Sequence, residues 1–103
     1  MPSLAPHLTF IHDPGHGWLR VPLAEIARLG IEAEISHYSF IDGAYAYLEE
    51  DCDYGRYIIA RQEQAYDLPK IRSRYVERFN RGLPRFGDAQ FSAAFWARLR
   101  RQP

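Results

Sequence analysis

The chain has 103 residues and a formal net charge of zero, and 47% of its residues are hydrophobic and 15% aromatic, as in a folded globular protein rather than a disordered one. Two domains would each have too little interior, so we expect a single domain over residues 1–103. No apolar run approaches the about 18 residues of a membrane span and no export signal opens the sequence, so we expect a cytoplasmic protein that does not enter a membrane.

The first predicted element is a β-hairpin. Residues 8–12 read as a short strand that ends at the turn sequence DPG (13–15), where Pro sets φ at the second turn position and Gly permits a positive φ at the third. Residues 18–21 then return as the partner strand, across a loop of about five residues. This arrangement places His12 and His16 at the turn end of the hairpin.

Residues 22–29 are predicted to form a two-turn helix. Pro22 suits the first turn, because the missing N–H of proline is not needed there. Gly30 is expected to end the helix in a left-handed conformation, with Ile31 packing back on Ile26 as in a Schellman ending. A helix this short is unstable alone, so tertiary packing must hold it.

A second hairpin is predicted from residues 35–41 and 44–48, which flank the two-residue turn signal Asp42-Gly43. A loop at these two positions sets Ile41 opposite Ala44. Strand alternation then places four aromatic side chains on one face: Tyr38, Phe40, Tyr45 and Tyr47. Such a face is either a binding platform or a second core layer, in which each cross-strand pair contributes roughly 0.2–1 kcal/mol.

A helix of about residues 52–65 is predicted next. The acidic run EED (49–51) precedes it, where negative side chains complement the positive end of the helix macrodipole. Leu68-Pro69 ends the helix. Cys52, the only cysteine, excludes an internal disulfide, and the neighbouring carboxylates disfavour its thiolate, which fits a reducing compartment.

Residues 70–79 are ambiguous. Ile71, Tyr75 and Phe79 are spaced as on one face of a helix, whereas the alternation of arginine with other residues favours an edge strand. We favour a strand over residues 70–76.

Asp88 is predicted to cap a final helix of about residues 89–100. Apolar residues on one stripe of that helix are expected to face the core: Phe91, Ala94, Phe95 and Leu99. Together these elements predict an α+β fold, in which a small antiparallel sheet of two β-hairpins has two to three helices packed on it.

The zero net charge hides a division along the chain. Residues 1–67 contain four basic and eleven acidic side chains, whereas residues 68–103 contain nine basic and two acidic ones, so the two parts carry net charges of −7 and +7. In so small a domain we expect the two parts to neutralise each other, through surface ion pairs that each contribute about 0–1 kcal/mol.

Two histidines give the first hairpin loop a candidate catalytic or metal-binding role. His12 and His16, with Asp13, offer imidazole and carboxylate groups that suit zinc or manganese. If the hairpins lie side by side, either histidine can meet Glu50 as an acid–base pair. An arginine such as Arg72 or Arg74 would complete a minimal set for RNA cleavage. Histidine spacing on a turn carries little information, so we favour turn and surface roles and expect neither a metal nor a cofactor.

Two larger groups of residues suggest binding surfaces. The first joins the aromatic face to the acidic run as a candidate protein contact: Tyr38, Phe40, Tyr45, Tyr47, Glu49, Glu50, Asp51 and Asp53. The second interleaves arginine with aromatic residues, as in proteins that bind single-stranded nucleic acid: Arg72, Arg74, Arg78, Arg81 and Arg85. Seven tyrosines and six phenylalanines are more than this domain can bury with every hydroxyl satisfied, so we expect some at a partner or self-association surface.

A series of short motifs runs through the first half of the chain: PGHGWLRVP (14–22), LGI (29–31), ISHYS (35–39), Gly43 and YLEEDCD (47–53). Their order and spacing resemble a family of short bacterial proteins carried on phages, plasmids and integrated mobile elements, over roughly residues 8–60. The resemblance implies an accessory protein of a mobile element. Such proteins are often counter-defence factors, including anti-CRISPR inhibitors. The family lends no catalytic residues, and residues 80–103 fall outside the resemblance.

We therefore favour a non-enzymatic protein that binds and inhibits a host defence complex, with an acidic patch that occupies a basic nucleic-acid channel. The first alternative is a small nuclease or metal-dependent hydrolase that uses His12, His16 and Glu50. The second is a nucleic-acid-binding protein that uses the arginines of residues 70–85. The identity of the target and the oligomeric state, with a homodimer among the options, stay open at this point.

Overall fold

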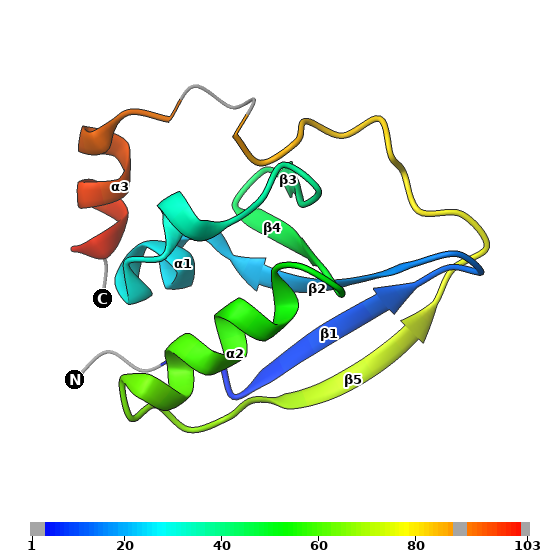
Figure 1. The fold of residues 1–103 in the computed structure, drawn as a ribbon, viewed down its shortest axis with the longest axis horizontal. Helices are drawn as coiled ribbons and strands as arrows, with labels where there is room; N and C mark the ends of the chain where they lie inside the picture. The colour runs from blue at the N-terminus through cyan, green and yellow to red at the C-terminus, as the bar shows by residue number, and fades with distance from the viewer. Residues whose placement is uncertain (1–3, 88–90, 102–103) are drawn as a thin grey trace.

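The computed structural model describes residues 4–87 and 91–101, and among them it confirms the α+β class (Figure 1). The elements in chain order are β1 (His7–His12), β2 (Gly17–Pro22), α1 (Leu23–Leu29), the 3₁₀ helix η1 (Glu32–Glu34), β3 (Phe40–Asp42), β4 (Tyr45–Glu49), α2 (Tyr54–Glu63), β5 (Lys70–Tyr75) and α3 (Ala93–Arg100). The strands form one sheet in the order β3-β4-β2-β1-β5. The expected antiparallel sheet is in fact mixed, because α2 carries the chain back across the sheet and β5 pairs with β1 in parallel.

Both predicted hairpins form, but the turn of the second differs from the prediction. Its loop consists of residues 43–44, so Ile41 pairs with Ala46 instead of Ala44. Gly43 has a φ of 62°, which suits glycine as the first loop residue of a type II′ turn. The change moves each partner by two positions. Because side chains alternate with a period of two, the aromatic residues of the two strands still share one face.

Residues 35–39 do not form the strand that the sequence predicts; a turn follows η1 instead. The Asp53 carboxylate accepts hydrogen bonds from the Ser36 backbone N–H at 3.0 Å, from the Ser36 hydroxyl at 2.7 Å and from the Ser39 hydroxyl. Asp53 is 2% exposed, so these bonds are made in the interior. Asp53 lies 17 residues after Ser36 and 14 after Ser39, and its hydrogen bonds to them override the local strand pattern.

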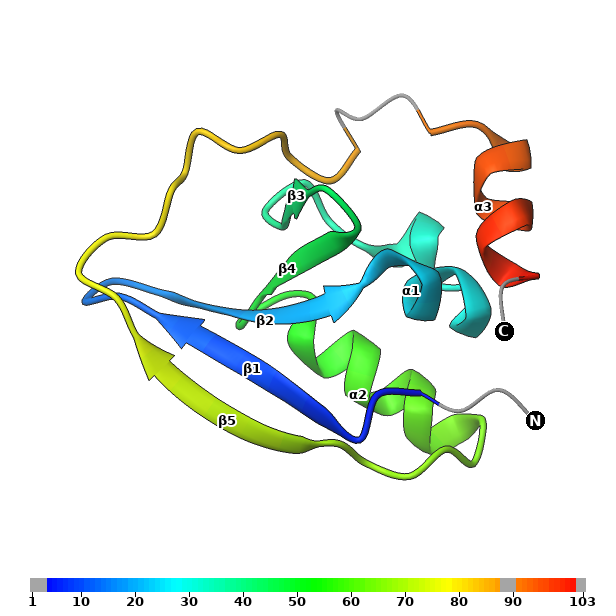
Figure 2. The same ribbon diagram turned by 180° about the vertical axis from the view of Figure 1, so that it is seen from behind.

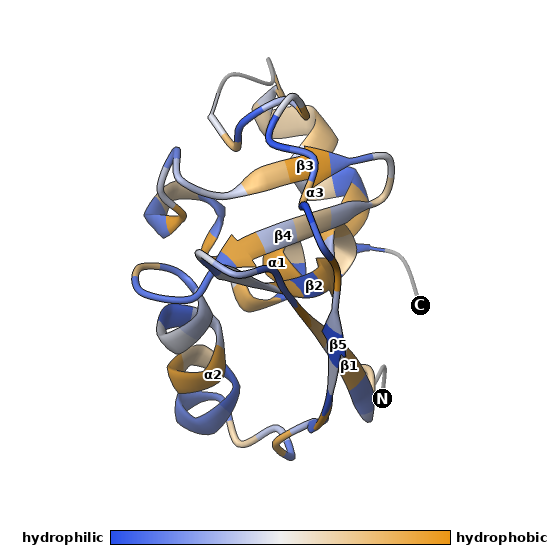
Figure 3. Ribbon diagram, turned by 90° about the vertical axis from the view of Figure 1, so that its right-hand side faces the viewer, coloured by the Kyte–Doolittle hydropathy of each residue, from blue (hydrophilic) through white to orange (hydrophobic). Residues whose placement is uncertain are grey.

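One face of the sheet carries the main core and is covered by the helices (Figure 1). In Figure 3, hydrophobic residues follow β3 and β4 and the middle of α2, and polar residues occupy the ends of that helix. Gly30 ends α1 with a φ of 72°, and the N–H groups of Gly30 and Ile31 donate to the carbonyl oxygens of Ala27 and Ile26 at 3.0 and 3.2 Å. These two bonds confirm the predicted Schellman ending.

A buried polar network joins α1, α2 and the N-terminal segment. Arg61 is 2% exposed and donates to the carbonyl oxygens of Asp67 at 2.8 Å and Ala5 at 3.0 Å. Glu25 accepts from the Tyr57 hydroxyl at 2.5 Å and from the Ala5 N–H at 2.6 Å. Burial, together with Glu25, raises the pKa of Tyr57 far above its usual value, so the hydroxyl stays protonated and keeps donating. Glu25, Tyr57 and Arg61 form their hydrogen bonds with other protein groups, so we assign the network a structural role.

No helix of the described residues lies on the opposite face of the sheet, here called the helix-free face. Residues 76–87, here called the strap, cross one end of this face on the way from β5 to β3 (Figure 2). Phe79 of the strap stacks on Trp18 with ring centres 4.0 Å apart. The Ile41 N–H donates to the carbonyl oxygen of Pro84 at 2.8 Å, so the strap also covers the outer edge of β3.

The final helix, α3, begins later than predicted. Its N-cap is Ser92, whose hydroxyl accepts a backbone hydrogen bond of 3.1 Å, and the predicted cap Asp88 lies outside the described residues. Trp96, which the predicted stripe omitted, is the buried residue of α3. Arg100 forms an ion pair of 2.9 Å with Glu32, which links the basic part of the chain to the acidic part. No helix in the described parts of the chain is long and apolar enough to cross a bilayer.

Candidate functional site

Asp13 organises the loop between β1 and β2. One carboxylate oxygen accepts hydrogen bonds from the N–H groups of Gly15 and His16, each at 2.9 Å. The other pairs with Arg81 at 2.8 Å and accepts from the Phe79 N–H at 3.2 Å, which attaches the strap to the loop. Arg81 and the loop N–H groups hold the pKa of Asp13 well below its usual range. Its oxygens are thus committed to protein donors, contrary to the interpretation of Asp13 as a metal ligand beside the histidines.

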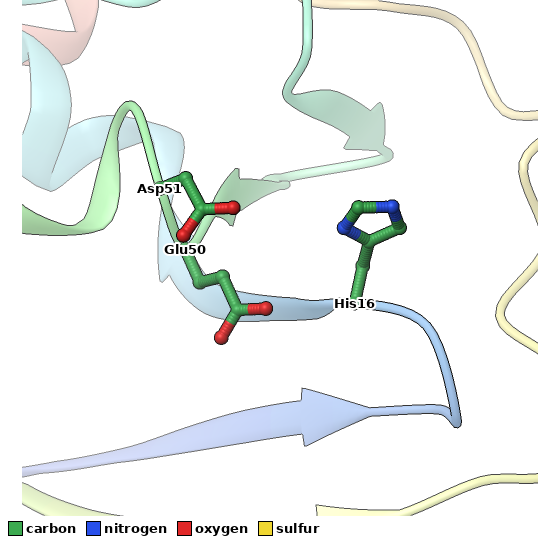
Figure 4. A group of neighbouring side chains, drawn as sticks. All are labelled: His16, Glu50 and Asp51. Atoms are coloured by element: carbon green, nitrogen blue, oxygen red, sulfur yellow. The ribbon is translucent and has the colours of Figure 1, made fainter.

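His16, Glu50 and Asp51 lie side by side where this loop meets the chain segment that leads into α2 (Figure 4). Each offers one ligand atom, and these atoms lie within 4.8 Å of one another. The Glu50 N–H donates to the Gly17 carbonyl oxygen at 3.0 Å, and the Glu49 carboxylate accepts from the Asp51 N–H at 3.0 Å. The structure therefore brings together the predicted pair of His16 and Glu50 and adds Asp51.

The side chains of this cluster are exposed, and none forms a hydrogen bond or ion pair with a described residue. One imidazole and two carboxylates are donors that suit zinc or manganese. His12 lies outside the cluster, half-buried, with its ring centre 6.0 Å from that of Phe10 and 5.5 Å from that of Tyr75. A metal site, if formed, would thus use Asp51 in place of His12.

The arginine needed for the predicted RNA-cleavage set lies on the other side of the sheet. His12, Glu50 and Ser73 line one shallow hollow. Arg72 and Arg74 flank Ser73 in β5, so strand alternation directs their side chains to the opposite face. The sheet thus separates His12 and Glu50 from these two cations.

The acidic run is only partly at the surface. Glu49 and Asp53 are 9% and 2% exposed and bind backbone or serine groups, whereas Glu50 and Asp51 are exposed. The hydrogen bond with Glu49, with further contributions from burial and the neighbouring acids, raises the pKa of the exposed Cys52 thiol. This agrees with the expectation that Cys52 is a poor nucleophile.

The aromatic face of the second hairpin is mostly a second core layer. Phe40 is 3% exposed, and its ring centre lies 5.6 Å from that of Phe79. Tyr47 also contacts Phe79, at 5.2 Å, and both Tyr47 and Tyr45 are half-buried. Tyr38, in the turn before β3, is 53% exposed. Of these four rings, only Tyr38 is largely available to a partner.

The arginines of the predicted basic segment fall into two groups. Arg81 pairs with Asp13, and Arg85 donates to the His37 carbonyl oxygen at 3.1 Å. The other group is exposed and has no hydrogen-bond or ion-pair partner among the described residues: Arg72, Arg74 and Arg78. Within this segment, the expected neutralisation by the acidic half therefore applies to Arg81 and not to Arg72, Arg74 or Arg78.

A single cross-strand row spans all five strands on the helix-free face. Phe40 pairs with Tyr47, Tyr47 with Arg20, Arg20 with Thr9, and Thr9 with Arg72. Residues directly opposite each other in a sheet present their side chains to the same face. The row thus leads from the buried aromatic layer to the exposed cations of β5.

Further residues extend this row on both sides. Lys70 and Arg74 lie two positions from Arg72, so they share its face. The guanidinium carbon of Arg20 lies 3.5 Å from the centre of the Tyr45 ring. We call the resulting surface the basic face: Arg20, Tyr45, Tyr47, Lys70, Arg72 and Arg74. Arg20 is not among the residues predicted for a binding surface, although the alternation of Trp18 and Arg20 in β2 is a signal that they share a face.

Comparison of the chain with models of protein families, with curated proteins and with solved structures finds no match.

Proposed function

We propose that this protein binds single-stranded nucleic acid on its basic face. The observation that carries the proposal is the row from Tyr47 through Arg20 and Thr9 to Arg72, which places tyrosine and arginine side by side on a face that no described helix covers. The side chains of Lys70, Arg72 and Arg74 in β5 are exposed and have no partner among the described residues.

The β5 cations suit a phosphate backbone. Lys70, Arg72 and Arg74 alternate along the strand, so successive side chains are separated by about 6.6 Å. Among the described strand residues, two acids share the face: Asp42 at its rim, and Glu49, which is buried and bonded to its own loop. Contacts between phosphates and such cations release counterions and give affinity that is independent of sequence.

The centre of the basic face suits unpaired bases. Bases of single strands stack on guanidinium planes as well as on aromatic rings, and the guanidinium of Arg20, which lies over the half-buried ring of Tyr45, offers such a plane. A duplex hides the faces of its bases inside the stack, so this contact favours single strands. Binding of this kind fits the counter-defence setting that the sequence resemblance implies, in which the protein would compete for the nucleic acid of a host complex.

The protein-binding inhibitor expected from the sequence is the second candidate. Tyr38, Asp51 and His16 line one hollow, and Tyr38 is 53% exposed, so an aromatic and acidic surface of small size remains beside the loop. Substitution of Glu50 and Asp51 by Lys should then reduce capture of a defence complex in a pull-down. Unchanged capture would remove this surface from consideration.

The test of the proposed function is fluorescence anisotropy with labelled single-stranded DNA, single-stranded RNA and duplex DNA, between about 50 and about 200 mM salt. We expect the single strands to bind more tightly than the duplex. The double variant Arg72→Ala/Arg74→Ala should bind more weakly, and its logarithmic salt slope should be shallower by about 0.7 for each lost phosphate contact. Arg98→Ala, which removes an exposed arginine of α3, is the matched control. Failure of the wild type to bind single strands, or an equal loss in the control, would refute the proposal.

A further inference from the structure

The outer edge of β5 presents unpaired backbone groups. The Lys70 N–H donates to the Pro6 carbonyl oxygen and the Val76 N–H to the His12 carbonyl oxygen, each at 2.8 Å, so the even-numbered residues bond toward β1. Backbone direction alternates along a strand, which turns the N–H and C=O groups of the odd-numbered residues outward: Ile71, Ser73 and Tyr75. No described strand pairs with this side of β5.

The two side-chain rows of β5 differ in chemistry. Ile71 is 36% exposed and Tyr75 is 57% exposed, and both lie on the helix side of the sheet with Ser73 between them. Arg72 and Arg74 lie on the basic face. All six residues of the strand are exposed, so neither row is covered by the rest of the described chain.

We propose that a second copy of this chain pairs with β5 in antiparallel orientation, centred on Ser73. Because the outward groups belong to alternate residues, this centre places Ser73 opposite Ser73 of the second copy and Ile71 opposite Tyr75 of the second copy. Each of the three resulting pairs exchanges two N–H···O bonds. Aromatic and β-branched residues are favourable cross-strand neighbours, so the helix-side row is complementary to itself.

The row of Arg72 and Arg74 on the basic face opposes this pairing unless an anion is present. The same register sets Arg72 opposite Arg74 of the second copy, and like charges in that position are destabilising. A strand pair of this length is also small compared with the about 1,200–2,000 Å² of stable interfaces. The two basic faces become continuous across the pair, so a nucleic-acid strand that lies over both copies would remove the repulsion. This last step rests on the proposed function, and the strand register does not.

The result is an association that depends on conditions. At about 0.1 M salt the Debye length is about 10 Å, so the arginine repulsion acts and the free protein should be monomeric. At about 1 M salt the Debye length is about 3 Å, and the screened protein should dimerise without nucleic acid. Single-stranded DNA should produce the dimer at low salt.

Sedimentation velocity under these three conditions tests the pairing, with two variants. Ser73→Pro removes an outward N–H and no bond to β1, so it should stay monomeric throughout, whereas its control Ser73→Ala should behave as the wild type. Arg74→Glu places an acid opposite Arg72 of the second copy, so it should dimerise at low salt without nucleic acid, with a dissociation constant about tenfold below that of the wild type.

The outcomes separate the pairing from the proposed function. Dimerisation of Arg74→Glu and of the wild type at high salt, without any binding of DNA, would support the edge pairing and refute the nucleic-acid function. Binding of DNA by a protein that stays monomeric in every condition would refute the pairing alone. Self-association that survives Ser73→Pro would also refute it. Capture of a synthetic strand with alternating Glu residues by a monomeric wild type would identify an acidic peptide, and not a second copy, as the occupant.

Discussion

The strand β5 and the strap that follows it are both rich in arginine and aromatic residues, yet the molecule uses them differently. In β5 the arginines and Tyr75 are exposed. In the strap, Phe79 is 7% exposed against Trp18, and Arg81 is bound to Asp13. Composition alone therefore does not reveal which cations are available to a partner. What decides is whether the fold places an acceptor, such as a buried carboxylate, opposite each one.

The largest expected effect tests the structural role of the strap. Phe79→Ala removes a buried ring that contacts Trp18, Phe40 and Tyr47, and should lower the free energy of unfolding by about 3–5 kcal/mol. Tyr75→Ala removes an exposed ring of β5 and should change it by less than about 0.5 kcal/mol. Urea denaturation of both variants measures the difference. Equal losses in the free energy of unfolding for the two variants would show that the aromatic residues of β5 and of the strap contribute equally to stability.

A smaller effect concerns the pH dependence of the bond between strap and loop. Since the pKa of Asp13 is depressed in the folded state, its stabilising contribution is complete above the unfolded value of about 3.9 and is lost as the pH falls toward the folded value. The stability of the wild type should therefore fall more steeply between about pH 5 and about pH 2 than that of Asp13→Asn.

Urea denaturation at a series of pH values checks this expectation. Asp42→Asn, which alters an exposed aspartate of β3, is the matched control and should follow the wild type. Parallel curves for the wild type and Asp13→Asn would contradict the assignment of Asp13 as the acceptor of Arg81.

The smallest expected effect separates individual arginines of the two segments. Arg72→Ala should make the salt slope of single-strand binding shallower by about 0.7, because one phosphate contact is lost. Arg85→Ala should leave the slope unchanged, because Arg85 donates to the His37 carbonyl oxygen and lies over the Phe40 ring. Anisotropy titrations over a range of salt concentrations measure both. A larger change of the salt slope for Arg85→Ala than for Arg72→Ala would show that the contact surface lies on the strap and not on β5.

Local features of the fold could be predicted because their causes lie within a few residues of each other. The chain bends at Asp13-Pro14-Gly15 as predicted, although Gly15 does not use the positive φ that it permits and the Asp13 carboxylate holds the bend instead. Gly30 ends α1 as expected. The strand over residues 70–75 follows from its alternating pattern. The second hairpin shows the limit of such signals, since Asp42-Gly43 indicated a turn but not which two residues would form it.

The candidate site could be predicted only in part. The pairing of His16 with Glu50 was expected on the condition that the two hairpins lie side by side, and the antiparallel pair of β2 and β4 meets that condition. Glu49 and Asp53 are not available for the predicted acidic contact, because their carboxylates accept hydrogen bonds from backbone or serine donors. Nothing in the acidic run itself distinguishes these two acids from their exposed neighbours.

The amino-acid sequence by itself determined the approximate positions of the turns, the ending of α1, the strand propensity of residues 70–75 and the division of charge between the two parts of the chain. Only the tertiary structure decided that β5 lies parallel to β1 at an open edge and that Arg20 and Arg72 share a row while Arg81 is bound. Turn and cap signals act between neighbouring residues. The availability of a charged side chain depends on what the fold brings across from distant parts of the chain.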